Sequence, residues 1–181
     1  MADMQQKKVL VVYATKRGTT GDVAGMVAKR LDGAVELYNA RSGRLFRAGA
    51  AEGDGKKPPA GFLGGYDLIV VGTPMYIGEP LSQIKQLCAR QEQVMGKAGY
   101  ALFTCGIGTQ EEDEKFIKNH LPAMFIEKAT SYRHLGGEVR LERMNVLARG
   151  IFKNMPSPGI DHAAIDEFCG ECNAALNRVE E

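Results

Sequence analysis

Hydrophobic positions along the chain alternate between short continuous runs and helically spaced stripes. Three runs, Lys8–Ala14, Asp67–Gly72 and Tyr100–Thr104, have the length and apolar content of strands buried on both faces, and Ala34–Tyr38 is a shorter candidate. Between the runs, apolar residues recur at helical spacing. The stripes lie at Val23–Leu31, at Leu81–Gln91 and from Glu111 to Ala129, where Pro122 predicts a break. This alternation predicts one α/β domain with a parallel sheet.

The carboxyl-terminal third of the chain contains two more amphipathic stripes. One predicts a helix over about 142–155, with Met144, Leu147, Ala148, Ile151, Phe152 and Met155 on one face. This helix either packs on the domain or is an interfacial or docking helix. Arg143, Arg149 and Lys153 lie on its other faces, and basic residues beside an apolar stripe suit a membrane surface or a quinone-bearing partner. The other stripe predicts a last helix that begins after an N-cap at Asp161.

The stretch 40–66 has no periodicity and is rich in glycine, alanine and basic residues. Pro58 and Pro59 prevent regular structure locally. We interpret it as a long surface loop, and nothing in its sequence requires a gating or docking role.

A cluster of hydroxyl and basic side chains joins the first strand to the first helix. It consists of Thr15, Lys16, Arg17, Gly18, Thr19 and Thr20. A helix amino end offers free backbone N–H groups and a positive dipole, which predicts a phosphate site here. The alternative is a threonine-rich N-cap with two solvated cations. The spacing fits neither a Walker loop nor a dinucleotide-binding fingerprint.

Two other strands also end in loops made largely of small residues. The first loop contains Thr73, Pro74, Met75, Tyr76, Ile77 and Gly78, and the second contains Thr104, Cys105, Gly106, Ile107, Gly108 and Thr109. The carboxyl ends of parallel strands meet at one edge of a sheet, where open α/β sheets bind ligands. We therefore expect the three loops to converge on one site.

The segment Tyr13–Thr20 resembles the FMN phosphate loop of flavodoxins. Its closest form is found in the flavodoxin-domain branch that contains the menaquinone-dependent protoporphyrinogen dehydrogenases, which also carry an extra helical segment near 142–155. The resemblance implies a single flavodoxin-like domain over 1–181. Its fold would be doubly wound α/β, with a five-stranded parallel sheet in the order 2-1-3-4-5 and helices on both faces. Tyr132–Arg140 resembles the final strand of the family.

The resemblance also implies FMN as the cofactor. Thr15–Thr20 would bind its phosphate, and the loops at 73–78 and 104–109 would lie on either side of its ring. Tyr76 is the candidate for ring stacking, or alternatively a core tyrosine. No acid–base pair stands out, so no catalytic residue is assigned, and His134 is interpreted as structural or exposed.

Composition narrows the class of protein further. The chain has 181 residues and a net charge of +1, whereas shuttle flavodoxins are typically strongly acidic. The sequence contains neither a signal-peptide core nor an apolar run long enough to span a membrane, so a cytoplasmic location is expected. Cys169 and Cys172 form a C-x-x-C pair in mid-helix, where neither a thioredoxin-like site nor a metal site is expected.

Two functional classes remain open from the sequence. The first is an FMN-dependent oxidoreductase, similar to the protoporphyrinogen dehydrogenases, that passes electrons from a reduced small-molecule substrate to a quinone or protein acceptor. The second is an electron carrier that serves a redox partner protein. A flavin-free receiver or phosphatase is disfavoured, because Thr15 and Thr73 stand where a receiver needs acidic residues. No nucleic-acid partner is expected, and a homodimer is compatible with the architecture.

Overall fold

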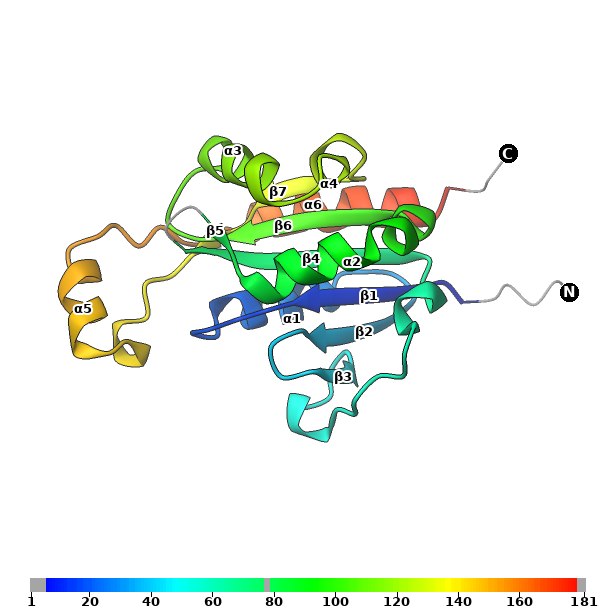
Figure 1. The fold of residues 1–181 in the computed structure, drawn as a ribbon, viewed down its shortest axis with the longest axis horizontal. Helices are drawn as coiled ribbons and strands as arrows, with labels where there is room; N and C mark the ends of the chain where they lie inside the picture. Colours follow the sequence, from blue (N-terminus) through cyan, green and yellow to red (C-terminus); the bar gives the residue numbers. More distant parts are fainter. Residues whose placement is uncertain (1–5, 77–78, 179–181) are drawn as a thin grey trace, which may run out of the picture.

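A parallel sheet forms the centre of the protein in a computed structural model that describes residues 6–76 and 79–178. Its parallel strands are β1 (Lys8–Tyr13), β2 (Ala34–Asn39), β4 (Leu68–Tyr76), β6 (Tyr100–Cys105) and β7 (Tyr132–His134). They lie side by side in the order β2-β1-β4-β6-β7 (Figure 1). This is the predicted order 2-1-3-4-5, so the doubly wound α/β fold is confirmed.

Helices cover both faces of this sheet (Figure 1). On one face lie α1 (Thr19–Ala28) and α6 (His162–Leu176), whose apolar sides form one core with β1, β4 and β6. On the other face lie α2 (Ser82–Ala98), α3 (Gln110–His120) and α4 (Met124–Glu127). Pro122 separates α3 from α4 as predicted, because it cannot continue a helix that needs its N–H. Asp161 caps α6 by accepting a hydrogen bond of 2.9 Å from the N–H of Ala164.

The stretch 40–66 is more ordered than its composition predicted. It contains the antiparallel edge strand β3 (Arg44–Arg47), which pairs with β2, and two 3₁₀ turns, η1 (Glu52–Asp54) and η2 (Phe62–Gly65). The interpretation as a loop without regular structure was therefore wrong. The pairing uses backbone groups, and with only two apolar residues, Leu45 and Phe46, the segment is too short to form a recognisable apolar pattern.

The strand β4 runs further than predicted. It continues through Tyr76 and pairs there with the antiparallel β5 (Glu79–Pro80), so Thr73–Tyr76 lie in a strand and not in a loop. The correction follows from pairing: β6 accompanies β4 as far as Cys105 opposite Pro74, and β5 then takes the next two residues. Ile77 and Gly78 lie outside the described residues.

Beyond β7, the chain leaves the sheet and forms a protruding segment. Gly136–Gly137 (β8) pairs with Gly159–Ile160 (β9), so the segment begins and ends at nearly the same place. Between these strands lie η3 (Leu141–Arg143) and α5 (Val146–Phe152), which stands apart from the main body (Figure 1). The predicted helix over 142–155 is thus a short helix preceded by a 3₁₀ turn, and the predicted final strand ends at His134. We call residues 138–155 the cover segment.

Across the described residues, no helix has both the length and the hydropathy needed to span a membrane.

Candidate functional site

The loop after β1 has the backbone geometry of an anion site. Gly18 is in the left-handed region (φ 95°) and opens α1, and its N–H donates to the hydroxyl of Thr15 at 2.8 Å. The first N–H groups of α1 have no acceptor within the helix. Thr20 is buried at the start of α1, while Thr19 is half-buried and Lys16 is exposed. The loop therefore gathers donors and positive potential in one turn.

Two arginines of the cover segment also reach this loop. Nη1 of Arg143 donates to the carbonyl of Arg17 at 2.8 Å, and a Cβ added to Gly18 would clash with the same guanidinium. Arg140 binds the carboxylate of Asp22 in the first turn of α1 at 2.6 Å. Neither contact could be predicted from the sequence, because spacing within the chain does not indicate which distant segment folds over a loop.

The second predicted set of residues lies at the end of β4. Thr73 is fully buried and accepts a hydrogen bond of 3.2 Å from the N–H of Leu81, so it anchors the start of α2 instead of facing a ligand. Pro74 and Met75 face a cavity described below. The side chain of Tyr76 lies outside the described residues, so its predicted stacking on a ring remains a prediction.

The third predicted set follows β6. The backbone of Gly106 approaches Gly137 so closely that a Cβ on Gly137 would clash with it, and the N–H of Gly106 donates to the carbonyl of Gly136 at 3.0 Å. Cys105 is buried, and burial raises the pKa of its thiol to about 12. Thr109 forms a capping box with Glu112 and so serves α3.

His134 and Asp113 connect the third set to β7. Nδ1 of His134 lies 2.8 Å from a carboxylate oxygen of the buried Asp113 and 3.5 Å from the hydroxyl of Thr104. The pair joins α3 to the last parallel strand. The interpretation of His134 as a structural residue agrees with this position.

One small cavity joins the three loops at the carboxyl edge of the sheet. Its volume is about 70 Å³. The predicted residues that line it are Arg17, Thr19, Thr20, Pro74, Met75, Cys105, Gly106 and Ile107. The remaining wall comes from the cover segment and the residue before it, namely Gly137, Glu138, Val139, Met144 and Phe152. Of the other predicted residues that the structure describes, Thr15, Lys16, Gly18, Thr73, Thr104, Gly108 and Thr109 do not line it.

The aromatic ring of Phe152 closes this cavity from the outside. Cζ of Arg17 lies 5.8 Å from the centroid of the ring, which is within the range of a cation–π contact. Ligand pockets for molecules of cofactor size have volumes of about 300–1,000 Å³. The cover segment must therefore move outward before a large ring system can enter between the loops.

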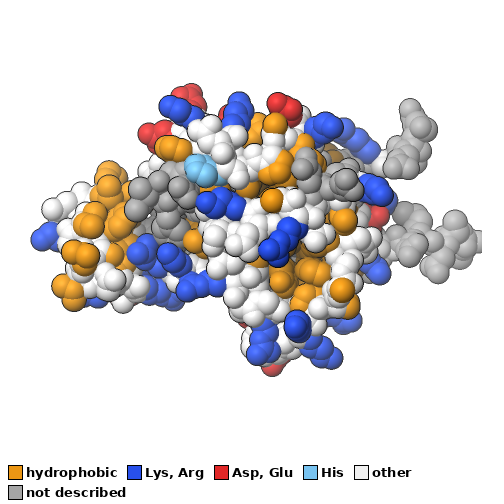
Figure 2. All heavy atoms as spheres, in the orientation of Figure 1, with side chains coloured by type: hydrophobic (Ala, Val, Ile, Leu, Met, Phe, Trp, Pro, Cys, Tyr) orange, Lys and Arg blue, Asp and Glu red, His pale blue; other side chains and the backbone are white. Residues whose placement is uncertain are grey.

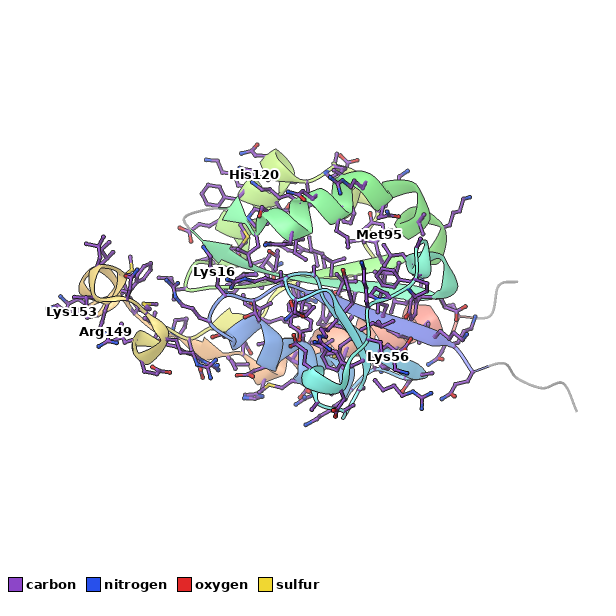
Figure 3. The ribbon with its side chains drawn as sticks, turned by 60° about the horizontal axis from the view of Figure 1, so that its bottom comes forward. Lys16, Lys56, Met95, His120, Arg149 and Lys153 are labelled. Carbon is purple, nitrogen blue, oxygen red and sulfur yellow. The ribbon has the colours of Figure 1, made fainter. Side chains whose placement is uncertain are left out.

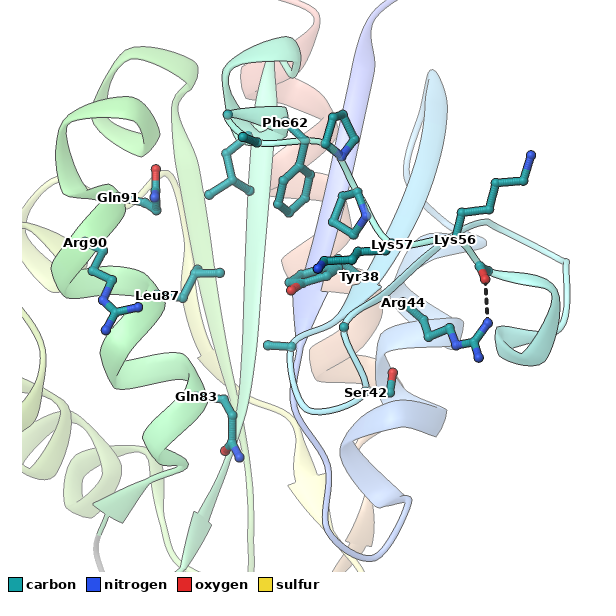
Figure 4. Close-up of a pocket in the computed structure, with 18 of the residues that line it drawn as sticks. Tyr38, Ser42, Arg44, Lys56, Lys57, Phe62, Gln83, Leu87, Arg90 and Gln91 are labelled. Carbon is teal, nitrogen blue, oxygen red and sulfur yellow. Dashed lines mark hydrogen bonds between the residues drawn. The ribbon is translucent and has the colours of Figure 1, made fainter.

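A second and larger cleft lies beside α2, with a volume of about 1180 Å³ (Figure 4). Tyr38, Phe62 and Leu87 provide apolar surface inside it, and the rings of Tyr38 and Phe62 pack edge to face at 5.0 Å. Lys57, from the stretch 40–66, and Arg90, from α2, line the cleft from opposite sides (Figure 4). The stretch 40–66 thus forms one wall of a cleft that combines an apolar interior with cations.

The four cysteines are all buried and free of disulfides. Cys169 and Cys172 lie in α6, and burial raises the pKa of the Cys169 thiol to about 11 and that of Cys172 further. Within the part of the chain that the structure describes, no group of three potential ligands could hold a metal ion. These thiols pack as small apolar groups in the core.

The fold and the geometry of the site define this protein as an open α/β domain with ligand loops at the carboxyl edge of its sheet. A family model described as the flavodoxin domain matches residues 10–163. The chain therefore belongs to the flavodoxin-domain family. The comparison with curated proteins gives no significant match.

Solved structures with the same fold are distant in sequence. A short-chain flavodoxin associated with a non-canonical PDU bacterial microcompartment has a TM-score of 0.56 at 15% identity, covering 94% of this chain and 99% of that one. A WrbA-like flavodoxin from Agrobacterium tumefaciens has a TM-score of 0.53 at 17% identity (94% and 96% covered). The flavodoxin of Fusobacterium nucleatum bound to flavin mononucleotide has a TM-score of 0.51 at 14% identity (93% and 98% covered).

Proposed function

We propose that this protein binds FMN at the carboxyl edge of its sheet and works as an oxidoreductase. The observation that carries the proposal is the convergence of three loops, represented by Arg17, Met75 and Gly106, on one cavity in a flavodoxin-domain chain. The flavin mononucleotide bound by the Fusobacterium nucleatum flavodoxin supports the same cofactor here.

The loop at 15–20 fits the phosphate of FMN by its own geometry. Gly18 gives the backbone a left-handed turn that leaves the first N–H groups of α1 free to donate. The guanidinium of Arg143 already lies against this turn, and Arg140 is tied to the same helix through Asp22. The Arg143 guanidinium beside free N–H donors suits an anion, whereas Asp22 and Glu138 offset the charge of Arg140.

The ring of FMN would lie between the ends of β4 and β6, against Pro74–Tyr76 and Cys105–Thr109. When bound, FMN supplies the redox chemistry, and the chain binds the ring, orients it and limits the access of water. Cys105 keeps its proton at neutral pH because burial raises its pKa to about 12, so it takes the part of an apolar wall.

The finer proposal is turnover of a reduced small molecule with a quinone or protein as electron acceptor, as in the protoporphyrinogen dehydrogenases. The cleft beside α2 supports it, since it offers space for a substrate with an apolar body and negative charges that meet Lys57 and Arg90. The near-neutral net charge also favours it over a carrier steered by acidic charge. The alternative is a carrier without its own substrate, which the scarcity of proton donors around the small cavity favours.

The first test is the absorbance spectrum of the purified protein before and after addition of FMN. We expect flavin bands that shift on binding, and weaker binding for Arg17→Ala and Thr20→Ala. Lys128→Gln is the control, because Lys128 is exposed at the end of α4 and lines neither cavity. If FMN does not bind at high micromolar concentration, the redox proposal fails.

The second test separates the two functional classes. The FMN-loaded protein is mixed with protoporphyrinogen and a water-soluble menaquinone analogue, and the appearance of protoporphyrin fluorescence is followed. Turnover that Arg90→Gln and Lys57→Gln slow, while Lys128→Gln does not, supports the oxidoreductase and its cleft. A protein that exchanges electrons rapidly with a reductase, but forms no protoporphyrin, is a carrier.

A further inference from the structure

The outer side of α5 exposes large apolar side chains. Val146 is 87% exposed, Leu147 79%, Ile151 61% and Met155 44%. Elsewhere in the described chain, Ile107 is the only other large hydrophobic side chain in the exposed class. Figure 2 shows these apolar side chains gathered at the tip of the protrusion that carries α5 in Figure 1. An exposed apolar group of this kind usually marks an interaction surface.

The inner side of the cover segment, formed by residues before α5 and at its end, contacts the rest of the protein. Met144 is buried, Phe152 lines the small cavity, and Arg143 donates to the carbonyl of Arg17. The predicted single apolar stripe is therefore divided: one part packs inward, and Leu147, Ile151 and Met155 point outward. These inward contacts connect the cover segment to the domain in this conformation, so the outward side chains are not needed for the core of the domain.

Positive charge surrounds the exposed apolar residues. The cover segment carries four arginine or lysine side chains and two glutamates. Arg140 is paired with Glu138 and Asp22, so the positive charge next to the apolar face comes from Arg149 and Lys153 of α5 and its end. Arg149 donates to the carbonyls of Leu141 and Met144, and these neutral acceptors leave its positive charge in place. Figure 3 places Arg149 and Lys153 on the protruding helix, at the same end of the molecule as Lys16. Apolar side chains rimmed by cations match a negatively charged bilayer surface.

We propose that the outer face of α5 and of the turn after it, formed by Val146, Leu147, Ile151 and Met155, docks on an anionic lipid bilayer. The protrusion lets these side chains enter the interface while the rest of the domain stays in water. A dimer formed through this face is the alternative. It would bring the cations of the two copies together. The four side chains also expose on the order of 500 Å², which is less than the ~800 Å² per partner of a standard protein interface. A second copy of this chain therefore fits this face less well than an anionic bilayer does. This proposal does not rest on flavin chemistry.

Co-sedimentation with lipid vesicles tests the proposal on the full-length, FMN-loaded protein. One set of vesicles contains phosphatidylcholine alone, and the other contains equal parts of phosphatidylcholine and phosphatidylglycerol. We expect binding to the anionic vesicles that is at least fivefold stronger than to the neutral ones and that weakens as salt is added. Leu147→Ser combined with Ile151→Ser should lower this binding at least tenfold.

Charge controls and a folding control make the result decisive. Lys153→Gln should weaken binding to the anionic vesicles, whereas Lys128→Gln, on the opposite part of the domain surface, should not. Because Leu147 and Ile151 are exposed, the double variant should keep the circular dichroism spectrum and the FMN affinity of the wild type.

The proposal is overturned if the wild type does not co-sediment at low salt. It is also overturned if light scattering shows a dimer that the double variant abolishes. A protein that binds the vesicles but has no FMN-dependent turnover would contradict the proposed oxidoreductase function and would leave the membrane-docking proposal unaffected.

Discussion

At the scale of single residues, Gly18 determines the shape of the phosphate loop. Its φ of 95° is costly for any residue with a Cβ, and the space where a Cβ would sit is taken by the guanidinium of Arg143. The glycine thereby lets a cation and the backbone turn come into contact. A phosphate that enters the loop would meet both.

Gly18→Ala should lower FMN affinity, because left-handed backbone with a Cβ costs about 1–2 kcal/mol, equivalent to roughly a tenfold change in the dissociation constant. The measurement is a titration of FMN fluorescence. Gly25→Ala is the matched control, since Gly25 lies in the same helix with no atom within 4 Å of an added Cβ. The control should bind FMN normally and be more stable by about 0.5–1 kcal/mol. Equal affinities for the two variants would show that Gly18 does not shape the site.

At the scale of elements, α6 is tied to the edge strand β7 by a cluster around Glu171. The carboxylate of Glu171 accepts a hydrogen bond from the hydroxyl of the buried Ser131, and Nη2 of Arg133 lies 2.5 Å from it. The hydrogen bond from Ser131 is the main cause that lowers the pKa of Glu171 below 4.5. Burial opposes the shift, and Arg133 adds to it.

The stability that Glu171 contributes should therefore depend on pH. A carboxyl group whose pKa is lowered by folding stabilises the protein above its unfolded pKa and loses this effect as pH falls through the lowered folded value. Urea unfolding should find Glu171→Gln less stable than the wild type at pH 7, by about 1 kcal/mol or less because the side chain is partly exposed. The difference should shrink as pH falls below 4.5.

Glu167→Gln provides the comparison for this prediction. Glu167 lies 3.8 Å from Arg133 and is more exposed, so its loss should change stability less at pH 7. A Glu171 effect that stays constant from neutral to acid pH would contradict the assigned cause.

The elements that could be predicted from the sequence are those with a strong local signal. The apolar runs of β1, β4 and β6 and the break at Pro122 can be read directly, because burial on both faces and the missing N–H of proline leave a local pattern. β3 could not be predicted, because it depends on pairing with β2. For the same reason the extension of β4 to Tyr76, which depends on β5, left no sign in its own residues.

The residues of the candidate site also fall into those that could be predicted from the sequence and those that could not. The donors of the phosphate loop were visible, since they are consecutive in the chain. Arg143 and Phe152 were not, because only the tertiary fold brings the cover segment over Arg17. Nor could an apolar stripe on a helix indicate which of its residues would face the body and which would face water.

At the scale of the whole molecule, the cover segment has an inner side that faces the cavity and an outer side that faces solvent. Its inner side, with Met144 and Phe152, closes the cavity between the three loops, and its outer side carries the exposed residues of α5. Both ends of the segment are tied together by the pairing of β8 with β9. An outward movement of the segment would break the contacts of Arg143 with Arg17 and of Arg140 with Asp22, but it would not require the parallel strands to separate.

Because the cavity of about 70 Å³ is too small for a flavin ring, outward movement of the cover segment should limit the rate of FMN association. Phe152→Ala removes the ring that lies against Arg17 and closes the cavity, so stopped-flow quenching of FMN fluorescence should find association several-fold faster than in the wild type. Ile151→Ala is the matched control, because this neighbouring residue on the same helix faces outward and should leave the rate unchanged. If both variants associate at the wild-type rate, the cover segment does not control entry, and FMN must reach the three loops by another route.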